Sequence, residues 1–283
     1  MFRTVTAPVA LSIALLAAAP ALAQTATNPG LPDPNDQSDN FTVALGGAFV
    51  PDYEGSDDSE GAPFAAIRGR VNGISFSTRG TYLYVDLIRR PDSGIDIDAG
   101  PIVGFRRERT GKVEDDFVTD LPERDTAIEI GGFAGVSFHG LTNPYDQLSL
   151  RLDVTSDVGG AHKSTIFSPN IEFGTPLSAR TFVGASLSAD FVAERYADYY
   201  YSISPAEGLI AGLPAYNADG GMKNWKLSTL VNQSITGDLT HGLSIFGAGT
   251  YSRLVGDIAD SPIVDGRGSK SQWQAILGLA YTF

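Results

Sequence analysis

Three histidines and a nearby serine are the residues in this sequence whose types could support hydrolytic or metal chemistry. His241 and Ser244 stand close together in the stretch HGLS, but on an extended chain their spacing points them to opposite faces. His139 and His162 stand in other segments, the chain has no cysteine, and no GxSxG motif occurs. The sequence therefore predicts no catalytic residue, no cofactor-binding residue and no metal site, and an enzyme is the least favoured class of function.

Two acidic stretches, EGSDDSE at 54–60 and KVEDD at 112–116, raise the question of divalent-cation binding because their carboxylates lie close together. A calcium loop holds its oxygen ligands at regular positions around a hinge glycine, and neither stretch has that spacing. We therefore interpret both as solvated loop surface. The formal net charge of the chain, −13, is unfavourable for binding nucleic acid, so no nucleic-acid partner is expected.

Strands are the elements that must position the other polar residues, because apolar and polar residues alternate through most of the chain after residue 40. In LSLRLDV at 148–154, Ser149, Arg151 and Asp153 face away from the apolar residues. The same period of two runs through TAIEIGGFAGVSF and GIDIDAGPIVGFR, and no period of 3.6 persists. The chain is therefore predicted to be essentially all-β, with strands at 41–50, 62–71, 73–79, 80–89, 94–107, 126–139, 146–156, 165–175, 179–191, 222–235, 241–254 and 270–283.

The connections between these strands alternate in length, with one exception at the tight turn Arg79-Gly80. Short links are NG, RPDSG, GLTNPYD, PLSA and GDLTH, and the others are mostly longer and polar or acidic, at 51–61, 107–125, 157–164, 193–221 and 255–269. A secreted β-sandwich gives no reason for this segregation, whereas a membrane barrel has short turns at one rim and long loops at the other. The sequence thus predicts a transmembrane antiparallel up-and-down β-barrel of about twelve strands, with ten as the alternative, short periplasmic turns and long extracellular loops.

The N-terminal segment has the features of export rather than of a strand. Residues 1–23 carry a positive charge, an apolar run and the small-residue pattern Ala21-Leu22-Ala23, which predict a secretory signal peptide cleaved between Ala23 and Gln24. Residues 24–39 are rich in Pro, Asp and Asn and are predicted to be a disordered periplasmic lead-in. The barrel is then expected to occupy residues 40–283.

The last predicted strand, SQWQAILGLAYTF, ends on an aromatic ring, and its apolar side is formed by Trp273, Leu277, Leu279, Tyr281 and Phe283. A closed barrel needs this strand to pair with the first, because every backbone group must be hydrogen-bonded within a bilayer. We therefore predict that these residues face outer-membrane lipid and lipopolysaccharide, and that they form the assembly signal for the outer-membrane insertion machinery. The predicted location is the cell outer membrane.

The polar sides of the strands are predicted to place charges of both signs in the barrel interior. These residues are Arg68, Arg70, Asp86, Asp96, Asp98, Arg106, Glu129, Arg151, Asp153, Glu172, Asp190 and Lys226. One interpretation is a solute pathway with a charged lining. We favour the other, a narrow lumen filled by ion pairs, because opposite charges stand side by side in Arg151 and Asp153. In the longest loop, Tyr196 and the run Tyr199–Tyr201 are expected to form the outer interfacial girdle, with a loop plug as the alternative.

Several stretches of the chain resemble the MipA/OmpV family of outer-membrane proteins. PDYEGSDD (51–58) is similar to the first loop of the family, and GLPAYNADGGMKNWKL (212–227), with the preceding YYYSISPAE, is similar to its aromatic and Gly-rich segment. YSRLVGDIADSPIVDGRGSKSQ (251–272) resembles the family's Leu-x-Gly-Asp-x-x-x-Ser-Pro-Ile-Val loop before the terminal strand. The resemblance covers residues 40–283, but loop 108–125 has no counterpart in it.

This resemblance implies a non-enzymatic outer-membrane scaffold that links the membrane to murein (peptidoglycan) synthesis and turnover. The partners that it implies are a lytic transglycosylase and a murein synthase. No residue motif carries the role, so the transfer is an analogy at the level of the fold. A small-solute channel of the porin type is the alternative function, and an outer-membrane enzyme is the remote one. No cofactor is expected.

Overall fold

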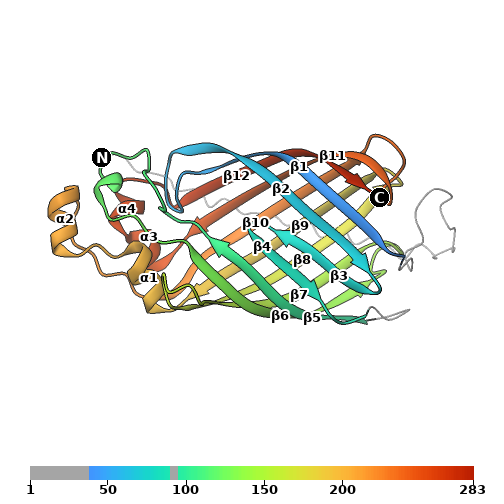
Figure 1. Ribbon diagram of the computed structural model, residues 1–283, viewed down its shortest axis with the longest axis horizontal. Coiled ribbons are helices and arrows are strands. Elements are labelled where there is room, and N and C mark those ends of the chain that lie inside the picture. Colours follow the sequence, from blue (N-terminus) through green and yellow to red (C-terminus); the bar gives the residue numbers. More distant parts are fainter. Residues whose placement is uncertain (1–37, 90–94) are drawn as a thin grey trace, which may run out of the picture. The chain divides into compact units, whose positions relative to one another are not determined.

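The computed structural model describes residues 38–89 and 95–283, within which twelve antiparallel strands close into a barrel (Figure 1). The strands are β1 Asn40–Pro51, β2 Ser59–Val71, β3 Ile74–Arg79, β4 Tyr82–Asp86, β5 Ile95–Arg106, β6 Ala127–His139, β7 Gln147–Asp157, β8 Thr165–Ser178, β9 Thr181–Val192, β10 Gly221–Ser234, β11 Gly242–Leu254 and β12 Ser271–Thr282. The predicted fold class is confirmed. The proposed signal peptide, its cleavage site and most of the lead-in lie outside the described residues.

The sheet closes between its first and last strands. Strands that follow one another in sequence are neighbours in the barrel, and β1 pairs with β12 in a register that runs from Thr42 opposite Thr282 to Phe49 opposite Ala275. The hydroxyl oxygens of the two threonines are 2.8 Å apart, which ties the seam at the short-turn rim. Closure leaves no continuous sheet edge along this seam, as the bilayer requires.

The outer surface of the barrel is apolar because each strand turns its apolar side outward. Leu45 on β1, Ile97 on β5 and Leu277 on β12 are each about three-fifths exposed, at 61%, 59% and 64%. A soluble protein rarely shows so broad an apolar surface, and here it forms a belt around the barrel. Among the described residues no helix is long and apolar enough to cross a membrane.

Aromatic rings mark both ends of this belt. Near the long loops, the rings of Trp225 and Tyr251 have centroids 5.4 Å apart, and Trp273 continues the group at 4.8 Å from Tyr251. Near the short turns, Phe283 lies 4.8 Å from Tyr281 and 6.1 Å from Phe41, again between ring centroids. Two aromatic rims around an apolar belt are the arrangement of a membrane barrel.

Strand β4 is shorter than the strand predicted at 80–89, whereas β3 agrees with the predicted strand 73–79 within one residue. The turn between them does fall at Gly80, whose φ of 57° favours glycine. However, β3 pairs with β2 only between Arg68 and Val71, so the turn lies part-way along the wall of the barrel. Between this turn and the long-loop rim, the rest of β2 is paired with β1 alone among the described strands.

Short helices occupy the long loops, a feature that the all-β prediction did not include. They are η1 Val118–Asp120, α1 Glu194–Tyr201, α2 Pro205–Ala211, α3 Gly256–Asp260 and α4 Pro262–Asp265. Segments of this length are too short to show a helical period in the sequence. The best local signal was the start of α2, where Ser204 and Glu207 form a capping box and Pro205 takes the first helical position.

The hydrophobic core of the protein is formed by these loops rather than by the barrel interior. Residues from the long loops, the short helices and the adjoining strand ends pack into one buried cluster at the long-loop rim, which we call the cap (Figure 1). The cluster consists of Tyr53, Val118, Leu121, Ile166, Val192, Tyr196, Ala197, Tyr200, Tyr201, Ile203, Ala211, Leu213, Ala218, Leu254, Ile258, Ala259, Ile263 and Val264.

Candidate functional site: the lumen beneath the cap

The tyrosines of α1 form the underside of the cap. Tyr196, Tyr200 and Tyr201 are all almost completely buried, and the ring centroids of Tyr196 and Tyr200 are 4.8 Å apart. The expectation that this cluster forms an interfacial girdle is therefore wrong for these three residues. Helix α1 folds back over the mouth of the barrel and turns its aromatic side inward, so the alternative of a loop that covers the barrel is the correct one.

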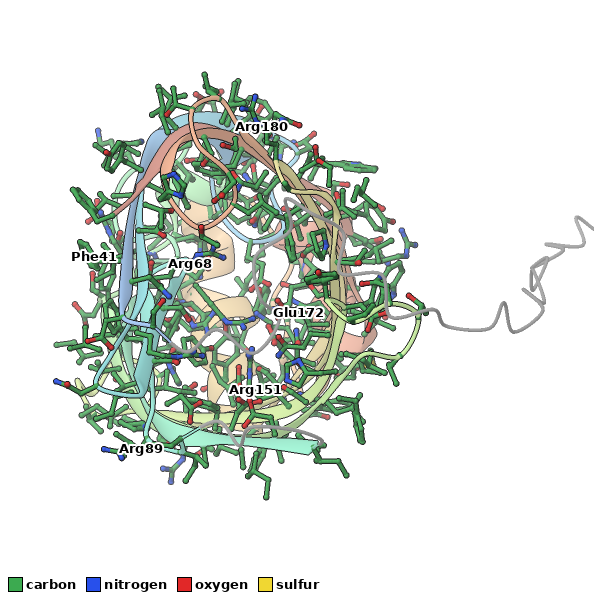
Figure 2. All side chains as sticks on the ribbon, turned by 90° about the vertical axis from the view of Figure 1, so that its right-hand side faces the viewer. Phe41, Arg68, Arg89, Arg151, Glu172 and Arg180 are labelled. Atoms are coloured by element: carbon green, nitrogen blue, oxygen red, sulfur yellow. The ribbon has the colours of Figure 1, made fainter. Side chains whose placement is uncertain are left out.

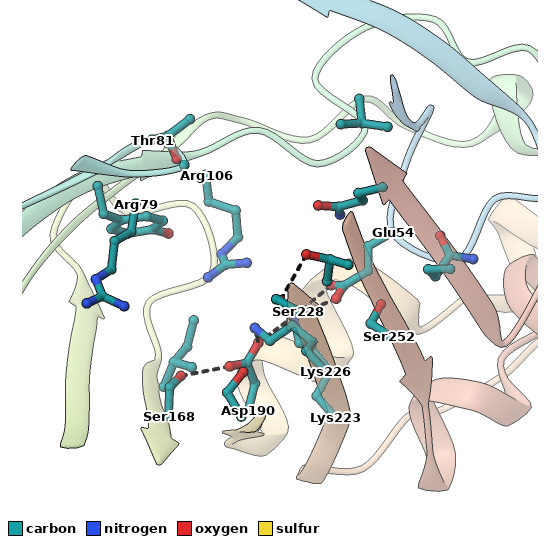
Figure 3. Close-up of a pocket in the computed structure, with 18 of the residues that line it drawn as sticks. Glu54, Arg79, Thr81, Arg106, Ser168, Asp190, Lys223, Lys226, Ser228 and Ser252 are labelled. Carbon is teal, nitrogen blue, oxygen red and sulfur yellow. Dashed lines mark hydrogen bonds and ion pairs between the residues drawn. The ribbon is translucent and has the colours of Figure 1, made fainter. Parts of the chain in front are cut away.

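A buried ion pair joins the cap to the barrel wall. The Nζ atom of Lys223 on β10 lies 2.7 Å and 2.8 Å from the two carboxylate oxygens of Glu54, in the first long loop (Figure 3). The Tyr201 hydroxyl and the Asn224 side-chain amide also donate to Glu54, at 2.9 Å each. Burial alone would raise the pKa of the Glu54 carboxyl, but the Lys223 ammonium outweighs burial and holds that pKa below its ordinary value.

A β-bulge explains why sequence reasoning did not find Lys223. A strict alternation that places Lys226 inside would turn Lys223 outward, toward lipid. In the structure the register shifts between Met222 and Asn224, so Lys223 is buried and Met222 faces outward. The signal that could have revealed the bulge is the charge itself, because a lysine on the lipid face of a membrane strand is costly.

Lys223 and Lys226 converge on a second carboxylate, that of Asp190 on β9. The Nζ–Oδ2 distances are 3.4 Å from Lys223 and 2.8 Å from Lys226 (Figure 3). The Ser168 hydroxyl donates to the other oxygen at 2.8 Å. Each ammonium therefore has at least one carboxylate partner within the barrel.

Glu129 is the centre of a second buried network on the opposite strands. Its carboxylate is fully buried and accepts from Arg106 Nε at 2.8 Å, from the Tyr82 hydroxyl at 3.0 Å and from the Thr155 hydroxyl at 2.9 Å. His162 Nε2 lies 3.2 Å from it. The ring of His162 packs against that of Tyr196, with centroids 5.0 Å apart, so this network also supports the underside of the cap.

A third group of charges crosses the middle of the lumen. Arg79 pairs with Glu172 at 2.9 Å, and Arg151 pairs with Asp153 at 2.7 Å. The guanidinium carbons of both arginines lie over the ring of Tyr84, at 5.6 Å and 5.2 Å from its centroid. Figure 2 shows Arg151 and Glu172 inside the barrel, as seen from the short-turn rim.

This middle group separates two cavities, which share Arg79, Tyr84 and Arg151 in their linings. The upper cavity, beneath the cap, has a volume of about 630 Å³, and the lower cavity, near the short turns, has about 580 Å³. Neither lining includes a residue of the helices α1 to α4. The lumen is therefore a divided, strongly charged space.

The structure places the charges named from the sequence as follows. Arg106, Arg151, Asp153, Asp190 and Lys226 line the upper cavity, and Arg68, Arg70, Asp86, Asp98, Arg151 and Glu172 line the lower one. Glu129 lies in the buried network described above, and Asp96 is buried with its carboxylate 3.9 Å from His139 Nε2. The lumen charges named from the sequence did not include Glu54, Glu108, Lys223 or His162, of which Lys223 is on a bulged strand and the others are in loops.

The residues with the best potential for hydrolytic chemistry are not brought together. His241 lies at a short turn, where its Nδ1 is 3.2 Å from Asp238, and the buried Ser244 hydroxyl donates to the Ala280 carbonyl at 3.4 Å. In the described ranges, 38–89 and 95–283, no group of three or more His, Cys, Asp or Glu side chains is arranged to hold a metal ion.

Half of the first acidic loop is also not the solvated surface that was expected. Tyr53 is almost completely buried, and its hydroxyl donates to the Ile263 carbonyl at 2.9 Å. Glu54 forms the ion pair described above, whereas Asp57 is exposed. In the second acidic loop, Asp115 is held by Arg267 at 2.9 Å. Both loops are therefore built into the cap.

A match to a known protein family covers nearly the whole barrel. The family described as "MltA-interacting protein MipA" matches residues 43–283. The chain belongs to the MipA family. The "MltA-interacting protein" of Escherichia coli (strain K12) is 27% identical to it over 103 residues, which are 36% of this chain and 38% of that protein. The Shigella flexneri protein of the same name matches equally. The match thus spans less than two fifths of these relatives.

Solved structures of other barrels show only distant similarity to this MipA-family chain. A toluene transporter, TodX, from Pseudomonas putida is 9% identical, with a TM-score of 0.39 and coverage of 87% of this chain and 89% of that one. An anion-selective porin from Comamonas acidovorans is 10% identical, with a TM-score of 0.37 and coverage of 86% and 98%. Similarities this low say nothing about what binds to or passes through the present barrel.

Proposed function

We propose that this MipA-family protein is a non-enzymatic scaffold of the outer membrane that links the membrane to enzymes of murein turnover. Its partners are then a lytic transglycosylase and a murein synthase on the periplasmic side. The family name supports the first partner, since the curated relatives are MltA-interacting proteins. The apolar belt with its two aromatic rims supports the location in the outer membrane.

The observation that carries the proposal is the cap. A porin needs a continuous water-filled route, but here a buried core of aromatic and aliphatic side chains lies over the long-loop end of the lumen. Four cations below it, Arg79, Arg151, Lys223 and Lys226, are engaged in ion pairs with carboxylates rather than left free for solute. A closed barrel of this kind serves best as a membrane anchor that presents a surface.

That surface is the rim of short turns, which the proposed topology places in the periplasm. The turns there are short, and both Asn40 at the start of β1 and Thr282 at the end of β12 lie at this rim (Figure 1). Arg89 and Arg180 lie at the same rim in Figure 2. Residues 38 and 39, the described end of the predicted lead-in 24–39, adjoin β1 at this rim, and the lead-in is the second segment that we propose for contact with a partner.

A small-solute channel is the second candidate, and the two cavities favour it. They share Arg79, Tyr84 and Arg151 in their linings, so side chains rather than backbone separate them. A rearrangement of Arg79 and Arg151 could join them. A route across the membrane would still require the cap to move.

Two measurements on the purified full-length protein decide between these functions. The scaffold predicts no steady conductance in a planar bilayer, and specific capture of a lytic transglycosylase from the same bacterium by the protein in nanodiscs. An unrelated barrel of similar size in the same nanodiscs is the control for capture. Large, steady conductance steps without capture of the transglycosylase would make the channel the leading function.

The terminal aromatic residue gives a separate test of the proposed membrane assembly. Phe283 is exposed, and its backbone N–H donates to the Phe41 carbonyl at 2.9 Å across the seam. Phe283→Asp keeps this backbone bond but removes the aromatic recognition end, so we expect export without insertion. The measurement is the heat-modifiable fraction in outer-membrane preparations, with Leu209→Asp, at an exposed position of α2, as the control. Normal insertion of the Phe283→Asp protein would contradict the assigned role of the terminus.

A further inference from the structure

The wall of the barrel has a gap above the turn between β3 and β4. β2 pairs with β3 from Arg68 to Val71. The Ile67 N–H donates to the Thr78 hydroxyl oxygen at 3.0 Å, and that hydroxyl donates to the Ile67 carbonyl at 3.3 Å. From Gly61 to Ala66, β2 has β1 on one side and no partner on the other among the described strands. The gap ends at β5, which pairs with β4 only as far as Gly104.

The sequence of β2 keeps this edge unpaired. Ile67 directs its N–H and C=O toward β3, so the alternation of the strand directs the backbone groups of Gly61, Pro63 and Ala65 the same way, into the gap. Proline has no N–H to offer an added strand and is found in sheets mainly at such edges. Pro63 therefore prevents further pairing at the centre of the gap.

The gap is bounded on all sides and lies within the apolar belt. The first and second long loops, 51–61 and 107–125, close it on the side of the cap, through Glu54 N–H to Glu108 Oε2 at 3.0 Å and Glu114 N–H to Asp52 Oδ2 at 2.8 Å. On its two sides, Phe49 of β1 and Phe105 of β5 face outward and are exposed. In a membrane, the gap would thus open toward lipid rather than toward water.

The upper cavity reaches this gap. Its lining includes Glu60 of β2, Gly80 and Thr81 of the short turn, and Arg106 of β5, all of which border the gap, as well as Lys223 on the far wall. Figure 3 shows Thr81 and Arg106 on one side of the cavity and Glu54 and Lys223 on the other. Because the cap lies above and the Arg79–Glu172 pair lies below, the gap is the direct route from this cavity to the membrane.

The carboxylates of this cavity that lie nearest the gap form no ion pair with the described residues. Glu60 is one of them. The other, Glu108, accepts the Glu54 N–H at 3.0 Å, and burial together with the Glu54 carboxylate raises its pKa although Arg106 and Lys223 act in the other direction. The side-chain oxygen of Asn170 is buried and receives no hydrogen bond from the described residues. By contrast, the cations deeper in the cavity are paired with carboxylates. Arg107, exposed at the outer edge, is the exception.

We propose that the gap is a lateral portal through which an amine-bearing amphiphile places its head group in the upper cavity while its apolar tail stays in the membrane. The ammonium group supplies the positive charge that Glu60 and Glu108 lack. Arg107 lies where it can contact a phosphate beside the amine. A phospholipid with an ethanolamine head and a free alkylamine share this chemistry. The proposal is independent of the scaffold function, because it requires neither a protein partner nor a conducting pore.

The test measures saturable binding of dodecylamine to the full-length protein in phosphatidylcholine nanodiscs, with empty nanodiscs as background. We expect the double variant Glu60→Gln/Glu108→Gln to weaken this binding by at least about tenfold, whereas the exposed Glu114→Gln leaves it unchanged. Dodecanol and dodecanoate, which have the same tail, should show no saturable binding. Phosphatidylethanolamine added to the nanodiscs should compete if the lipid is the source of the amine, and should not if free alkylamines are. The proposal would be overturned if the double variant bound dodecylamine as tightly as the parent protein does. It would also be overturned if the parent protein bound dodecylamine, dodecanol and dodecanoate equally.

A second variant tests the route. Inserting Val-Thr after Arg79 and again before Thr81 lengthens β3 and β4 and gives β2 the partner strand that it lacks. We expect dodecylamine binding to be lost while the heat-modifiable barrel is retained. Undiminished binding by this folded variant would show that the amine enters by another path. If the insertion fails to fold, the paired Gln variants still decide whether the cavity takes an amine.

Discussion

The cap and the lumen of this barrel are held together in opposite ways. In the cap, irregular loops and short helices bury a hydrophobic core, whereas in the lumen regular strands present ion pairs and hydrogen bonds. In a soluble β-protein the strands would form the core and the loops would be solvated. The difference follows from the solvent, because lipid takes up the apolar side of every strand and leaves the polar side for the interior. A hydrophobic core can then form only beyond the end of the barrel.

Lys223 is the residue at which the two regions meet, so its replacement should have the largest effect. Lys223→Met leaves the Glu54 carboxylate buried without a cation, which typically costs about 3–5 kcal/mol. We expect the cap to detach from the wall, detected as new protease cleavage in the loop 193–220 and loss of near-UV circular dichroism from its tyrosines. Lys226→Met is the matched control, because its partner Asp190 keeps Lys223. An intact cap in Lys223→Met would show that the two regions are independent.

A change inside the core of the cap should open the lumen without altering its charges. Tyr196→Ala removes a fully buried ring that packs on Tyr200 and His162, and truncation of a buried aromatic costs about 3–5 kcal/mol. We expect flickering conductance in a planar bilayer where the parent protein gives none. Leu209→Ala, on the exposed side of α2, should give no conductance, like the parent protein. If the Tyr196→Ala protein gives no conductance, the ion pairs alone block the lumen.

The stability of the cap should depend on pH through two glutamates with opposite shifts. The lowered pKa of Glu54 contributes stability above the ordinary glutamate pKa, and this contribution is lost as the pH falls through the lowered value. The raised pKa of Glu108 contributes stability at low pH, and this is lost as the pH rises through the raised value. We therefore expect the cap to be most stable in mildly acidic solution.

The variant Glu108→Gln isolates one of these two effects. It should abolish the decline on the alkaline side of the optimum and keep the decline on the acidic side, as followed by thermal unfolding of the near-UV signal at a series of pH values. An unchanged alkaline decline would show that another group is responsible.

The smallest effect is expected for an ion pair of the middle lumen. The side chains of Arg79 and Glu172 are 40% and 41% exposed, so water screens their attraction and the pair contributes less than about 1 kcal/mol. Arg79→Gln should leave barrel and cap stability nearly unchanged, as measured by thermal unfolding. A loss comparable to that of Lys223→Met would remove the distinction between the buried boundary and the wetter lumen.

The regular part of this molecule could be predicted because its pattern repeats over the whole barrel. Alternation located each strand, and it assigned Arg151 and Asp153 to one side, where they form an ion pair. The bulge that turns Lys223 inward breaks this period at a single place and leaves only a misplaced charge as its signal. The split between β3 and β4 was predicted at its observed place, but β4 ends at Asp86 rather than at residue 89, because the alternation of the sequence continues past the end of the strand.

The cap could not be predicted because its contacts join loops that are far apart in sequence. Tyr53 packs with α4 through its bond to Ile263, and Glu54 meets Tyr201, at sequence separations of 210 and 147 residues. Nothing local in PDYEGSDD distinguishes a buried glutamate from a solvated one. The capping box at Ser204 was the exception, because its signal is contained in four consecutive residues.

The seam between β1 and β12 also sets the order in which the barrel can form. Thr42 and Thr282 are 240 residues apart, and bringing such distant segments together costs about 3 kcal/mol more chain entropy than closing a hairpin of about ten residues. The hairpins of neighbouring strands can therefore form first, whereas the seam can form only after the final strand is in place. Until then the growing sheet carries two open edges that are able to pair with other chains. Completion of the seam is thus the step that removes both of these edges.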